Sequence, residues 1–525
     1  MPFLNVTYPE AIQFLYDLRL FGLKLGLENT FKLAALAGNP QHRLRFIHVA
    51  GTNGKGSTCA MLESIYRVAG LRVGLFSSPH MVSFRERIQI NRQLIGERDV
   101  VRLVTHLREL SNAGLSQAQE AEGGCFSRGG GAAVEPQGSP SGRQEPCGLE
   151  NRALLDKHDA CPTFFEFVTV MALKYFAEQN CDLVIWETGM GGRLDATNIV
   201  TPLASVITNI QFDHQNWLGN TLEEIATEKA GIIKPGVPVI TAADAPEALE
   251  VIAKTASERN AAMTLVNRQE PALDPSQEGK RRMSASDHPI PSGGVTGLVD
   301  ELDLPLLGEH QRLNAALAVA TVRVLQDKIP VSNEAMRRGL ETVQWPGRLQ
   351  LVTTDSGQTF LLDGAHNAAG ADALREALCS GAIQRAIPAR SSFAEAARDR
   401  CRQDASSTLI LGVLADKDWQ QVCAALAPLA RRILLVPVPS ERTAAPELLR
   451  NACAAINPAA QTIACPSLAD ALKQTADDPF VIITGSLYLV GEAMEALAIS
   501  PAPPAGERGL NEWTLKNDQT PKPRL

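Results

Sequence analysis

The pattern of apolar and polar positions along the chain predicts a protein of the α/β class. Short apolar runs rich in valine and isoleucine alternate with longer segments of helical periodicity. Continuous apolar strands that alternate with helices are typical of a parallel sheet covered on both faces. In the first part of the chain we expect strands over residues 45–50, 71–77, 183–187, 204–208 and 237–241, and helices over residues 57–69, 163–179 and 222–231.

The same pattern starts again after residues 345–348, which read Trp-Pro-Gly-Arg. The sequence Asp-Ser-Gly at residues 355–357 separates two apolar runs and indicates a β-hairpin. Further strands are expected over residues 408–413, 433–437 and 480–484. We therefore expect a hinge at residues 345–348, between a large domain over residues 1–344 and a smaller α/β domain over residues 345–500.

Several segments have the composition of insertions. Residues 113–160 and 268–298 are rich in small and polar residues without sustained periodicity, and residues 384–407 are a weaker case. Residues 501–525 form a polar segment rich in proline. Such compositions bury too little apolar area to offset the entropy lost on ordering. We expect flexible loops and a disordered tail, and assign no chemistry to them.

Composition and charge narrow the classes of function. The formal net charge of −8 argues against a nucleic-acid partner, which requires a basic surface. The ten cysteines include no Cys-x-x-Cys pair, so a zinc cluster is not expected. The N-terminal residues lack the basic and apolar segments of a signal peptide, and no apolar run approaches the ~20 residues that cross a bilayer. We expect a cytoplasmic monomer that does not bind membranes.

A glycine-rich loop follows the first predicted strand and precedes a helix. Residues 51–57 read Gly-Thr-Asn-Gly-Lys-Gly-Ser, so backbone N–H groups and the helix N-terminus can surround a phosphate. The usual P-loop has a glycine where Val49 stands, and Gly56 is additional. The alternative is a tight turn with a solvated lysine, but the strand–loop–helix order favours a phosphate site. We predict that phosphate groups are bound by Thr52, Asn53, Gly54, Lys55, Gly56 and Ser57; the family resemblance described below implies that they are those of ATP.

Two later strand ends carry further candidate groups. Ligands of a doubly wound sheet gather at the carboxyl ends of its strands. Glu187 ends one strand and offers oxygens that suit Mg²⁺, and His214 follows the next strand and could ligate a metal or orient a phosphate. Alone, His214 would more often be a surface residue. Asp213 is either a loop cap or a partner of a ligand, and from the residues alone Lys229 is a solvated lysine at a helix end.

The order of these motifs resembles that of the bifunctional dihydrofolate synthase/folylpolyglutamate synthase family, within the Mur ligase superfamily. The resemblance covers nearly the whole chain outside the insertions, and the joint pattern is specific although no single motif is. The matching segments are residues 50–57, 77–80, 187–198, 213–214, 228–232 and 363–367.

The resemblance implies a large P-loop ATPase domain of the Mur-ligase type with a mostly parallel sheet, followed by a smaller Rossmann-like domain. ATP would lie between the two domains. Ser78 and Glu187 would ligate one magnesium ion with Ser57 nearby, and Glu187 and His214 would serve a second. Lys229 matches a carbamylated lysine, whose anionic form can support a metal ion where an ammonium would repel it. The resemblance also allows for a bound monovalent cation.

The resemblance also assigns the remaining substrate contacts. Asn314, Arg348 and Asp363 match residues that contact the nucleotide. Residues 416–418 (Asp-Lys-Asp) fit the family pattern, but we expect no role for them beyond a turn and a helix cap. The pteroate end of a folate would bind near Leu23, Lys24, Leu25, Thr163, Leu194 and Ala196.

The resemblance implies an ATP-dependent carboxylate–amine ligase that adds L-glutamate to dihydropteroate, to the γ-carboxyl of reduced folates, or to both. Lys55, Glu187, His214 and Lys229 would be the catalytic residues of a reaction through an acyl phosphate. One alternative is a muramyl-peptide ligase, which the form of the phosphate loop and residues 77–80 disfavour. The other is a nucleotide-dependent regulatory module without catalysis, which would not need Glu187, His214 and Lys229 together.

Overall fold

A computed structural model describes most of the chain as two compact units. The described residues of one unit lie within Met1–Arg43 and Gly96–Gln179, and those of the other within Leu44–Ile95 and Asn180–Glu512. This division does not follow the expected boundary between residues 344 and 345, which stays a prediction. The structure describes residues 6–19, 26–112, 161–267, 299, 302–381, 383, 386, 407–500, 507 and 510, and the backbone of residues 113–123.

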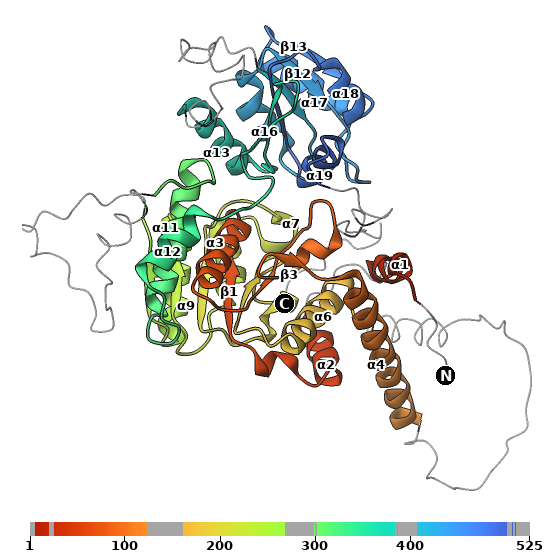
Figure 1. The fold of residues 1–525 in the computed structure, drawn as a ribbon, viewed down its shortest axis with the longest axis vertical. Coiled ribbons are helices and arrows are strands. Elements are labelled where there is room, and N and C mark those ends of the chain that lie inside the picture. The colour runs from red at the N-terminus through yellow and green to blue at the C-terminus, as the bar shows by residue number, and fades with distance from the viewer. Residues whose placement is uncertain are drawn as a thin grey trace, which may run out of the picture. The chain divides into compact units, whose positions relative to one another are not determined.

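The first unit is helical (Figure 1). Phe14 of α1 packs edge to face on Phe167 of α6, with 5.4 Å between the ring centroids. Arg102 of α4 forms an ion pair of 2.8 Å with Glu178 of α6. Apolar and charged contacts therefore hold these helices together. The elements of this unit are α1 (Tyr8–Leu18), α2 (Glu28–Leu36), the short helix η2 (Pro40–Arg43), α4 (Glu97–Gly123) and α6 (Phe164–Glu178).

The helix α4 corrects the expected start of the first insertion. We expected a loop from residue 113, but α4 continues to Gly123. Residues 113–123 include alanine, leucine, glutamine and glutamate, which have high helix propensity, and this can extend a helix without an apolar stripe. The rest of this insertion, the expected loop over residues 268–298 and most of residues 384–407 lie outside the described residues.

The second unit contains a mostly parallel sheet of eight strands. The pairs β2–β3 and β3–β4 are antiparallel, and all other neighbours are parallel. In spatial order the strands are β4 (Gln93–Leu94), β3 (Ile88–Ile90), β2 (Val73–Phe76), β5 (Leu183–Glu187), β1 (Phe46–Ala50), β6 (Ala204–Ile207), β7 (Val239–Thr241) and β8 (Met263–Leu265).

The register of this sheet places three strand ends side by side. The central strand β1 lies between β5 and β6, and it pairs Val49 with Glu187 on β5 and Ala50 with Ile207 on β6. After β1 the chain continues to β2 on one side of β1, and after β5 it crosses to β6 on the other side. This reversal of direction marks a topological switch point at β1. Ligands of open α/β sheets bind at such points, beyond the carboxyl ends of the strands.

Helices cover both faces of this sheet. The helices α3 (Lys55–Val68), α11 (Glu309–Val324) and α12 (Asn333–Glu341) lie together, and their apolar residues join Val49 of β1 in one buried cluster. Ala50, the next residue of β1, belongs to a second cluster with α8 (Leu222–Ala230) and α9 (Pro246–Glu258). This change of face between neighbouring residues is the alternation that a buried strand requires. Three short helices complete the region, η3 (Phe84–Arg87), η4 (Ala196–Ile199) and α7 (Gln215–Leu218).

The same unit contains a second, six-stranded sheet. Among the strands that the structure describes in this sheet, β9 and β10 form the antiparallel pair, which confirms the hairpin predicted around residues 355–357. The other pairs are parallel. In spatial order the strands are β13 (Gln461–Ala464), β12 (Arg432–Leu435), β11 (Thr408–Leu411), β14 (Phe480–Thr484), β10 (Thr359–Leu362) and β9 (Gln350–Thr353).

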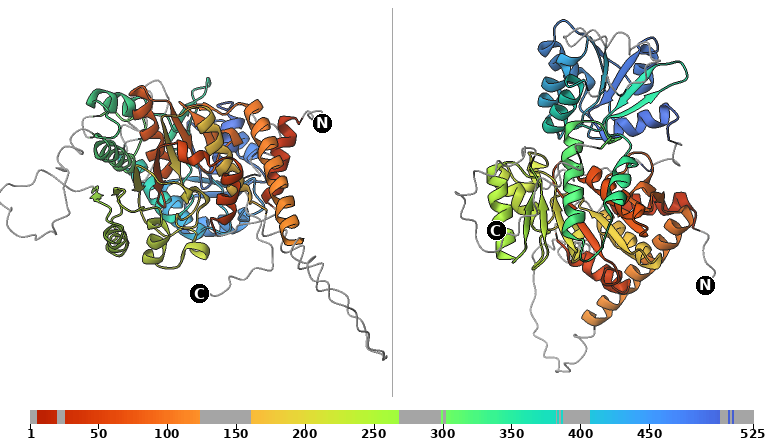
Figure 2. Two further views of the ribbon diagram at one scale, coloured as in Figure 1. Left: turned by 90° about the horizontal axis from the view of Figure 1, so that it is seen from below. Right: turned by 60° about the vertical axis from the view of Figure 1, so that its left-hand side comes forward.

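The second sheet is also covered on both faces, as the blue helices of Figure 2 show. Leu361 packs toward α13 (Ala368–Cys379), α16 (Trp419–Leu426) and α17 (Pro446–Ile456), with η6 (Ala427–Leu429) beside them. Leu362 packs toward α18 (Leu468–Gln474) and α19 (Leu487–Ala496). The two largely parallel sheets confirm the predicted α/β fold class.

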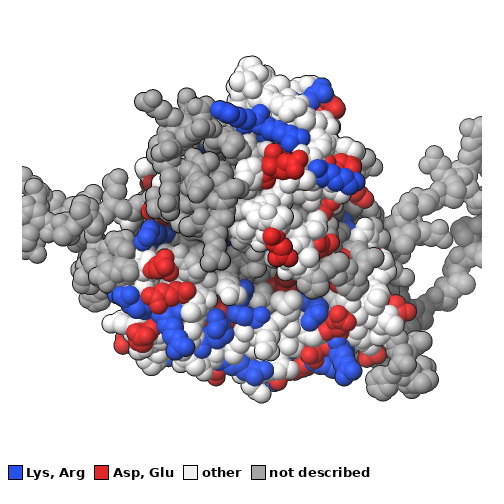
Figure 3. All heavy atoms as spheres, turned by 45° about the horizontal axis from the view of Figure 1, so that its top comes forward, with Lys and Arg blue, Asp and Glu red and all other residues white. Residues whose placement is uncertain are grey.

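On the face drawn in Figure 3, acidic and basic side chains are interspersed. Within the described part of the chain, no helix combines the length and the apolar character needed to span a bilayer.

Candidate active site

The glycine-rich loop lies between β1 and α3, and neighbouring side chains approach its backbone closely. Gly51 and Gly54 have φ values of 145° and 83°, which side chains other than glycine rarely adopt. A Cβ atom on Gly51 would collide with the Thr208 hydroxyl, and one on Gly54 would lie 2.5 Å from Asn314 Oδ1. A Cβ on Gly56 would lie 3.0 Å from the Trp345 ring. The loop therefore needs glycine for conformation and for space.

Residues after β6 hold the loop in place. Asn53 N–H donates to Asn209 Oδ1 at 2.7 Å, and Thr52 N–H donates to the Asn209 carbonyl at 2.9 Å. The Thr208 hydroxyl donates to the Asn53 carbonyl at 2.6 Å. The loop is thus fixed by the neighbouring strand end as well as by its own turn.

Two lysines converge on one carbonyl of this loop. Lys55 Nζ donates to the carbonyl oxygens of Gly51 at 3.1 Å and Thr52 at 3.2 Å. Lys229 Nζ comes from the end of α8 and donates to the same Gly51 oxygen at 2.8 Å. Burial, and after it the charge of Lys55, lowers the pKa of Lys229 to about 7. Near neutral pH, Lys229 is therefore uncharged in a sizeable share of the molecules. The residues alone had indicated a solvated lysine, which would be charged.

Glu187 ends β5 beside this loop and is buried, with 3% of its surface exposed. Its Oε2 accepts a hydrogen bond of 3.2 Å from Ser78 N–H. Burial raises the pKa of Glu187 to about 7, although Lys55 and the Ser78 N–H group favour the charged form. Nearby positive charges and the hydrogen bond therefore do not fully offset the cost of burying the charged form of Glu187. Ser57, which the family resemblance predicts to lie near the first magnesium ion, is buried in the first turn of α3.

A divalent cation beside Glu187 would supply the positive charge that this buried carboxylate lacks. Within the described residues, no group of three or more His, Cys, Asp and Glu side chains is arranged to hold a metal ion. Mg²⁺ does not need such a group, because one or two protein oxygens can suffice when substrate phosphates and waters complete its shell. The carboxylate of Glu187 and the hydroxyl of Ser78 are suitable protein ligands for that arrangement.

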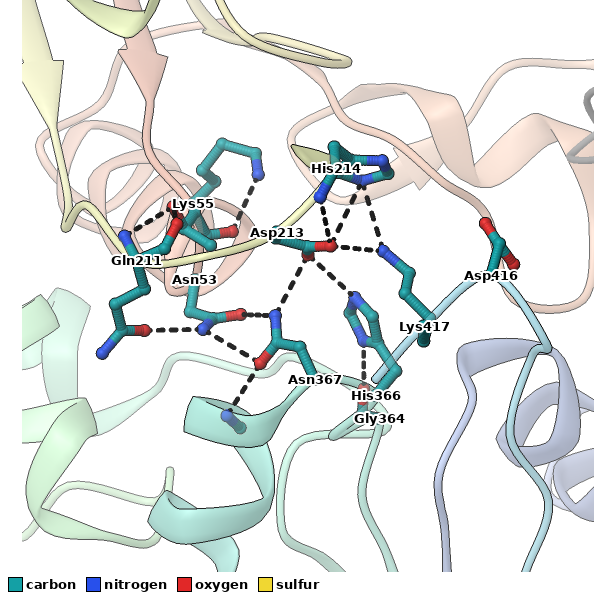
Figure 4. Close-up of polar contacts among 12 residues, drawn as sticks. Asn53, Lys55, Gln211, Asp213, His214, Gly364, His366, Asn367, Asp416 and Lys417 are labelled. Atoms are coloured by element: carbon teal, nitrogen blue, oxygen red, sulfur yellow. Dashed lines mark hydrogen bonds and ion pairs between the residues drawn. The ribbon is translucent and has the colours of Figure 1, made fainter. Parts of the chain in front are cut away.

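Asp213 lies at the centre of a polar cluster that joins both sheets (Figure 4). Its carboxylate forms an ion pair of 2.6 Å with Lys417 and accepts a hydrogen bond of 3.1 Å from Asn367. His366 Nε2 lies 3.9 Å away and His214 Nε2 4.0 Å away. Burial would raise the pKa of Asp213, but the charge of Lys417 and its hydrogen bond outweigh burial and hold the pKa well below its usual range.

Both histidines of this cluster are neutral. Loss of solvent around the ring and the charge of Lys417 lower the pKa of His214 to about 3 and that of His366 to about 4. His366 Nδ1–H donates to the Gly364 carbonyl at 2.7 Å, which fixes its tautomer. Lys417 Nζ lies 3.4 Å from His214 Nε2. The nearest charged neighbour of this imidazole nitrogen is therefore a lysine, where the sequence predicted a metal shared with Glu187.

Asn367 extends the cluster to the phosphate loop. Its Nδ2 donates to Asn53 Oδ1 at 3.1 Å, and Asn53 Nδ2 donates to Gln211 Oε1 at 2.9 Å. The same Asn367 caps α13 by accepting from Gly370 N–H at 2.8 Å. A side chain from the segment between β10 and α13 thus touches the loop expected to hold ATP.

The other residues predicted to contact ATP lie at two places. Asn314 is buried on α11 against Gly54, and its Nδ2 donates to Gln311 Oε1 at 3.0 Å. Asp363 is buried at the end of β10, where it accepts from the N–H groups of Leu349 and Ala365, each at 2.9 Å. Burial raises the pKa of Asp363, opposed mainly by the nearby Arg348.

The residues predicted to bind the pteroate end lie in different parts of the chain. Thr163 belongs to the helical unit, where it caps α6 in a reciprocal capping box with Glu166. In the sheet unit, Leu194 is half-buried and Ala196 is buried in η4. Leu23, Lys24 and Leu25 lie outside the described residues. Their role in substrate binding stays a prediction.

Sequence reasoning missed several contacts of this site. We expected only a turn and a cap at residues 416–418; Asp418 does cap α16, but Lys417 pairs with Asp213. Trp345 was taken only as part of a hinge, yet it contacts the phosphate loop. Neither role has a local signal, because each depends on contacts between segments far apart in sequence. Motif 363–367 did point to the Asn367 region.

Comparison with known proteins decides the family. Residues 156–322 match the family described as the Mur ligase middle domain. The chain is 32% identical over 500 residues to the dihydrofolate synthase/folylpolyglutamate synthase of Bacillus subtilis, covering 94% of this chain and 99% of that protein. The chain belongs to the dihydrofolate synthase/folylpolyglutamate synthase family. The family predicted from the motifs is therefore confirmed.

Solved structures of this family have the same fold. The Escherichia coli protein FolC in complex with DHPP and ADP aligns with a TM-score of 0.69 at 27% identity, covering 95% of this chain and 99% of that chain. The folylpolyglutamate synthase of Mycobacterium tuberculosis, complexed with ADP and AMPPCP, aligns with a TM-score of 0.70 at 26% identity, covering 94% and 100%. Both members were thus seen with an adenine nucleotide or its analogue.

Proposed function

We propose that this protein is an ATP-dependent ligase that adds L-glutamate to dihydropteroate, to the γ-carboxyl of reduced folates, or to both. The observation that carries the proposal is the meeting of Lys55, Lys229 and Glu187 around a glycine loop, at the carboxyl ends of adjacent strands. Family membership adds the substrate class, because relatives are named dihydrofolate synthase and folylpolyglutamate synthase.

In the first step, an oxygen of the substrate carboxylate attacks the γ-phosphorus of ATP. The bond to the β–γ bridging oxygen breaks, ADP leaves, and an acyl phosphate forms. The protein contributes positioning and charge, since the loop N–H groups and Lys55 can surround the phosphates. Lys55 must then exchange its bonds to the Gly51 and Thr52 carbonyls for phosphate oxygens.

Glu187 and Ser78 would hold the Mg²⁺ that accompanies ATP. When bound, this ion supplies positive charge between the phosphates and the substrate carboxylate and reduces their repulsion. Glu187 would then be held as a carboxylate, because a cation beside it lowers its pKa from about 7. A second magnesium ion at His214 would require Lys417 to move from its place 3.4 Å from Nε2.

In the second step, the uncharged amine of L-glutamate attacks the acyl carbonyl carbon. The tetrahedral species expels inorganic phosphate, and the new amide forms with loss of a proton to solvent. The acyl phosphate must be kept from water until this attack. The hydrogen bonds from Asn367 to Asp213 and to Asn53 support this requirement, because they link the segment after β10 to the phosphate loop.

Two variants and a control test the proposal. Purified Lys55→Ala and Glu187→Ala should each lose ATP-dependent ligation of L-glutamate to dihydropteroate or tetrahydrofolate while keeping the fold by circular dichroism. Lys473→Ala, which removes a lysine whose side chain is 77% exposed, should match the unaltered protein. Near-normal turnover in either of the first two variants would contradict the proposed site.

A further inference from the structure

A carboxylate from near the end of the chain lies buried beside the proposed metal-binding segment. Glu507 is only 1% exposed, although it falls in the tail that the sequence predicts to be disordered. Its Oε2 accepts hydrogen bonds from the Ser83 hydroxyl at 2.9 Å and from Phe84 N–H at 2.6 Å. Its carbonyl oxygen accepts from His80 Nε2–H at 2.9 Å. Glu507 therefore binds the segment through both its side chain and its backbone.

The segment that Glu507 contacts is closed by further polar bonds. His80 Nδ1 accepts from Arg87 Nε–H at 2.9 Å, so the bond to Glu507 and the bond to Arg87 use opposite sides of one neutral imidazole. The carboxylate of Glu86 accepts from the N–H groups of Met81, Val82 and Ser83 at 2.8, 3.0 and 2.8 Å. The carboxylates of Glu507 and Glu86 thus both accept hydrogen bonds from residues 81–84.

This segment, residues 77–87, contacts Glu187 through Ser78. Ser77 N–H donates to the Arg87 carbonyl at 3.1 Å and closes the segment at its base. The next residue, Ser78, donates its N–H to Glu187 Oε2 at 3.2 Å. Hydrogen bonds therefore connect His80 through Arg87 to Ser77, the residue next to Ser78.

The segment also packs against the second sheet. Val82 belongs to the apolar cluster that contains Val490 of α19. A Cβ on Gly491 would collide with the Met81 carbonyl oxygen, which shows how closely α19 approaches. The segment, which follows β2 of the first sheet, therefore packs against α19, a helix that covers the second sheet.

We propose that Glu507 is a positioning residue of the active site, whose bonds to Ser83, Phe84 and His80 hold Ser78 in place for the metal ion at Glu187. This inference rests on the proposed function, because it assigns Glu507 a part in binding Mg²⁺ with ATP. The carboxylate is not itself a ligand. It acts by fixing the segment between Ser78 and Arg87.

The test measures, below the unfolding temperature of each variant, the free Mg²⁺ concentration that gives half-maximal ligation at saturating ATP. Isothermal titration calorimetry of Mg²⁺ into the protein with bound ADP gives the same comparison without turnover, and the two concentrations should change together. Glu507→Ala removes the acceptor for Ser83 and Phe84 and should raise this concentration about tenfold. Glu507→Gln keeps a carbonyl oxygen at the same place and should stay within about twofold of the unaltered protein. Glu258→Ala, at an exposed glutamate that ends α9, is the matched control and should change nothing.

A double-mutant cycle separates positioning from general destabilisation. Ser83→Ala alone should raise the Mg²⁺ requirement, and Glu507→Ala should add less in that background than alone, since both remove one shared bond. If Glu507→Ala does not fold, Ser83→Ala and Glu507→Gln still carry the test. An unchanged Mg²⁺ requirement in Glu507→Ala and Ser83→Ala would overturn the inference. That result differs from failure of the proposed function, in which the unaltered protein forms no ligation product.

Discussion

Lys55 and Lys229 donate hydrogen bonds to the same oxygen, the Gly51 carbonyl, at 3.1 and 2.8 Å. Two ammonium groups at one acceptor repel each other, and Lys229 is the more buried of the pair. The repulsion is relieved when Lys229 loses its proton or its charge is reversed. This geometry supports the proposed carbamylation of Lys229, which would replace its positive charge with a negative one.

Replacement of Lys229 should be partly repaired by small anions. Lys229→Ala should lose most ligation activity, because the cavity left behind lacks the anion of a carbamate. Short-chain carboxylic acids added at high concentration should restore part of the activity. The steady-state rate of phosphate release with and without acetate measures this effect. Full activity in the variant without any additive would show that Lys229 is inert.

Carbamate formation on Lys229 should depend on pH. Burial lowers the pKa of this lysine to about 7, and only the uncharged amine reacts with carbon dioxide. The carbamate signal in ¹³C NMR with labelled bicarbonate should therefore be strong above about pH 8 and disappear as the pH falls below about 6. Lys229→Ala is the control for other labelled amines. A signal of equal strength across this range would contradict the assignment.

The ion pair between Asp213 and Lys417 should stabilise the fold measurably. Both side chains are buried, at 9% and 8% exposure, so removal of one partner leaves an uncompensated charge. Asp213→Asn should lower the free energy of unfolding by about 3–5 kcal/mol. Chemical denaturation measures this loss. Asp470→Asn removes the partner of the exposed Lys473 and should leave the free energy of unfolding nearly unchanged. Equal costs in the two variants would argue against a special role for Asp213.

Alanine variants of two glycines can distinguish backbone strain from steric crowding in the phosphate loop. Gly54 and Gly357 have nearly the same φ, 83° and 84°, but only Gly54 has a side chain against it, that of Asn314. Alanine at either position should cost about 1 kcal/mol of stability from backbone strain. Only Gly54→Ala should also weaken ATP binding, by more than about tenfold, in isothermal titration calorimetry. Equal affinity in both variants would show that the close approach is unimportant.

The sequence was sufficient for the parts of the fold that depend on local patterns. The apolar run at residues 183–187 is β5 with the predicted bounds, and the Asp-Ser-Gly signal is the turn between β9 and β10. The carboxyl-end rule then indicated where Glu187 would lie. The missed contacts are of another kind. Lys417 meets Asp213, and Glu507 meets Ser83, across more than two hundred positions, and no periodicity or propensity records such a pairing.

The tail shows the limit of composition as a guide. A proline-rich polar stretch predicts disorder because its average burial is low. A single carboxylate can still dock when N–H and O–H donors are already aligned to receive it, as Ser83, Phe84 and His80 are for Glu507. This depends on the geometry of another segment, which the tail sequence does not contain.

The central claim is that ATP cleavage is coupled to joining L-glutamate to a folate-type carboxylate. The most direct measurement follows labelled L-glutamate and inorganic phosphate together, with dihydropteroate, tetrahydrofolate or a UDP-linked muramyl substrate as acceptor. We expect labelled product and phosphate in equal amounts with dihydropteroate or tetrahydrofolate, and none with the muramyl substrate. Incorporation only with the muramyl substrate, or ATP cleavage without a labelled product, would contradict this account.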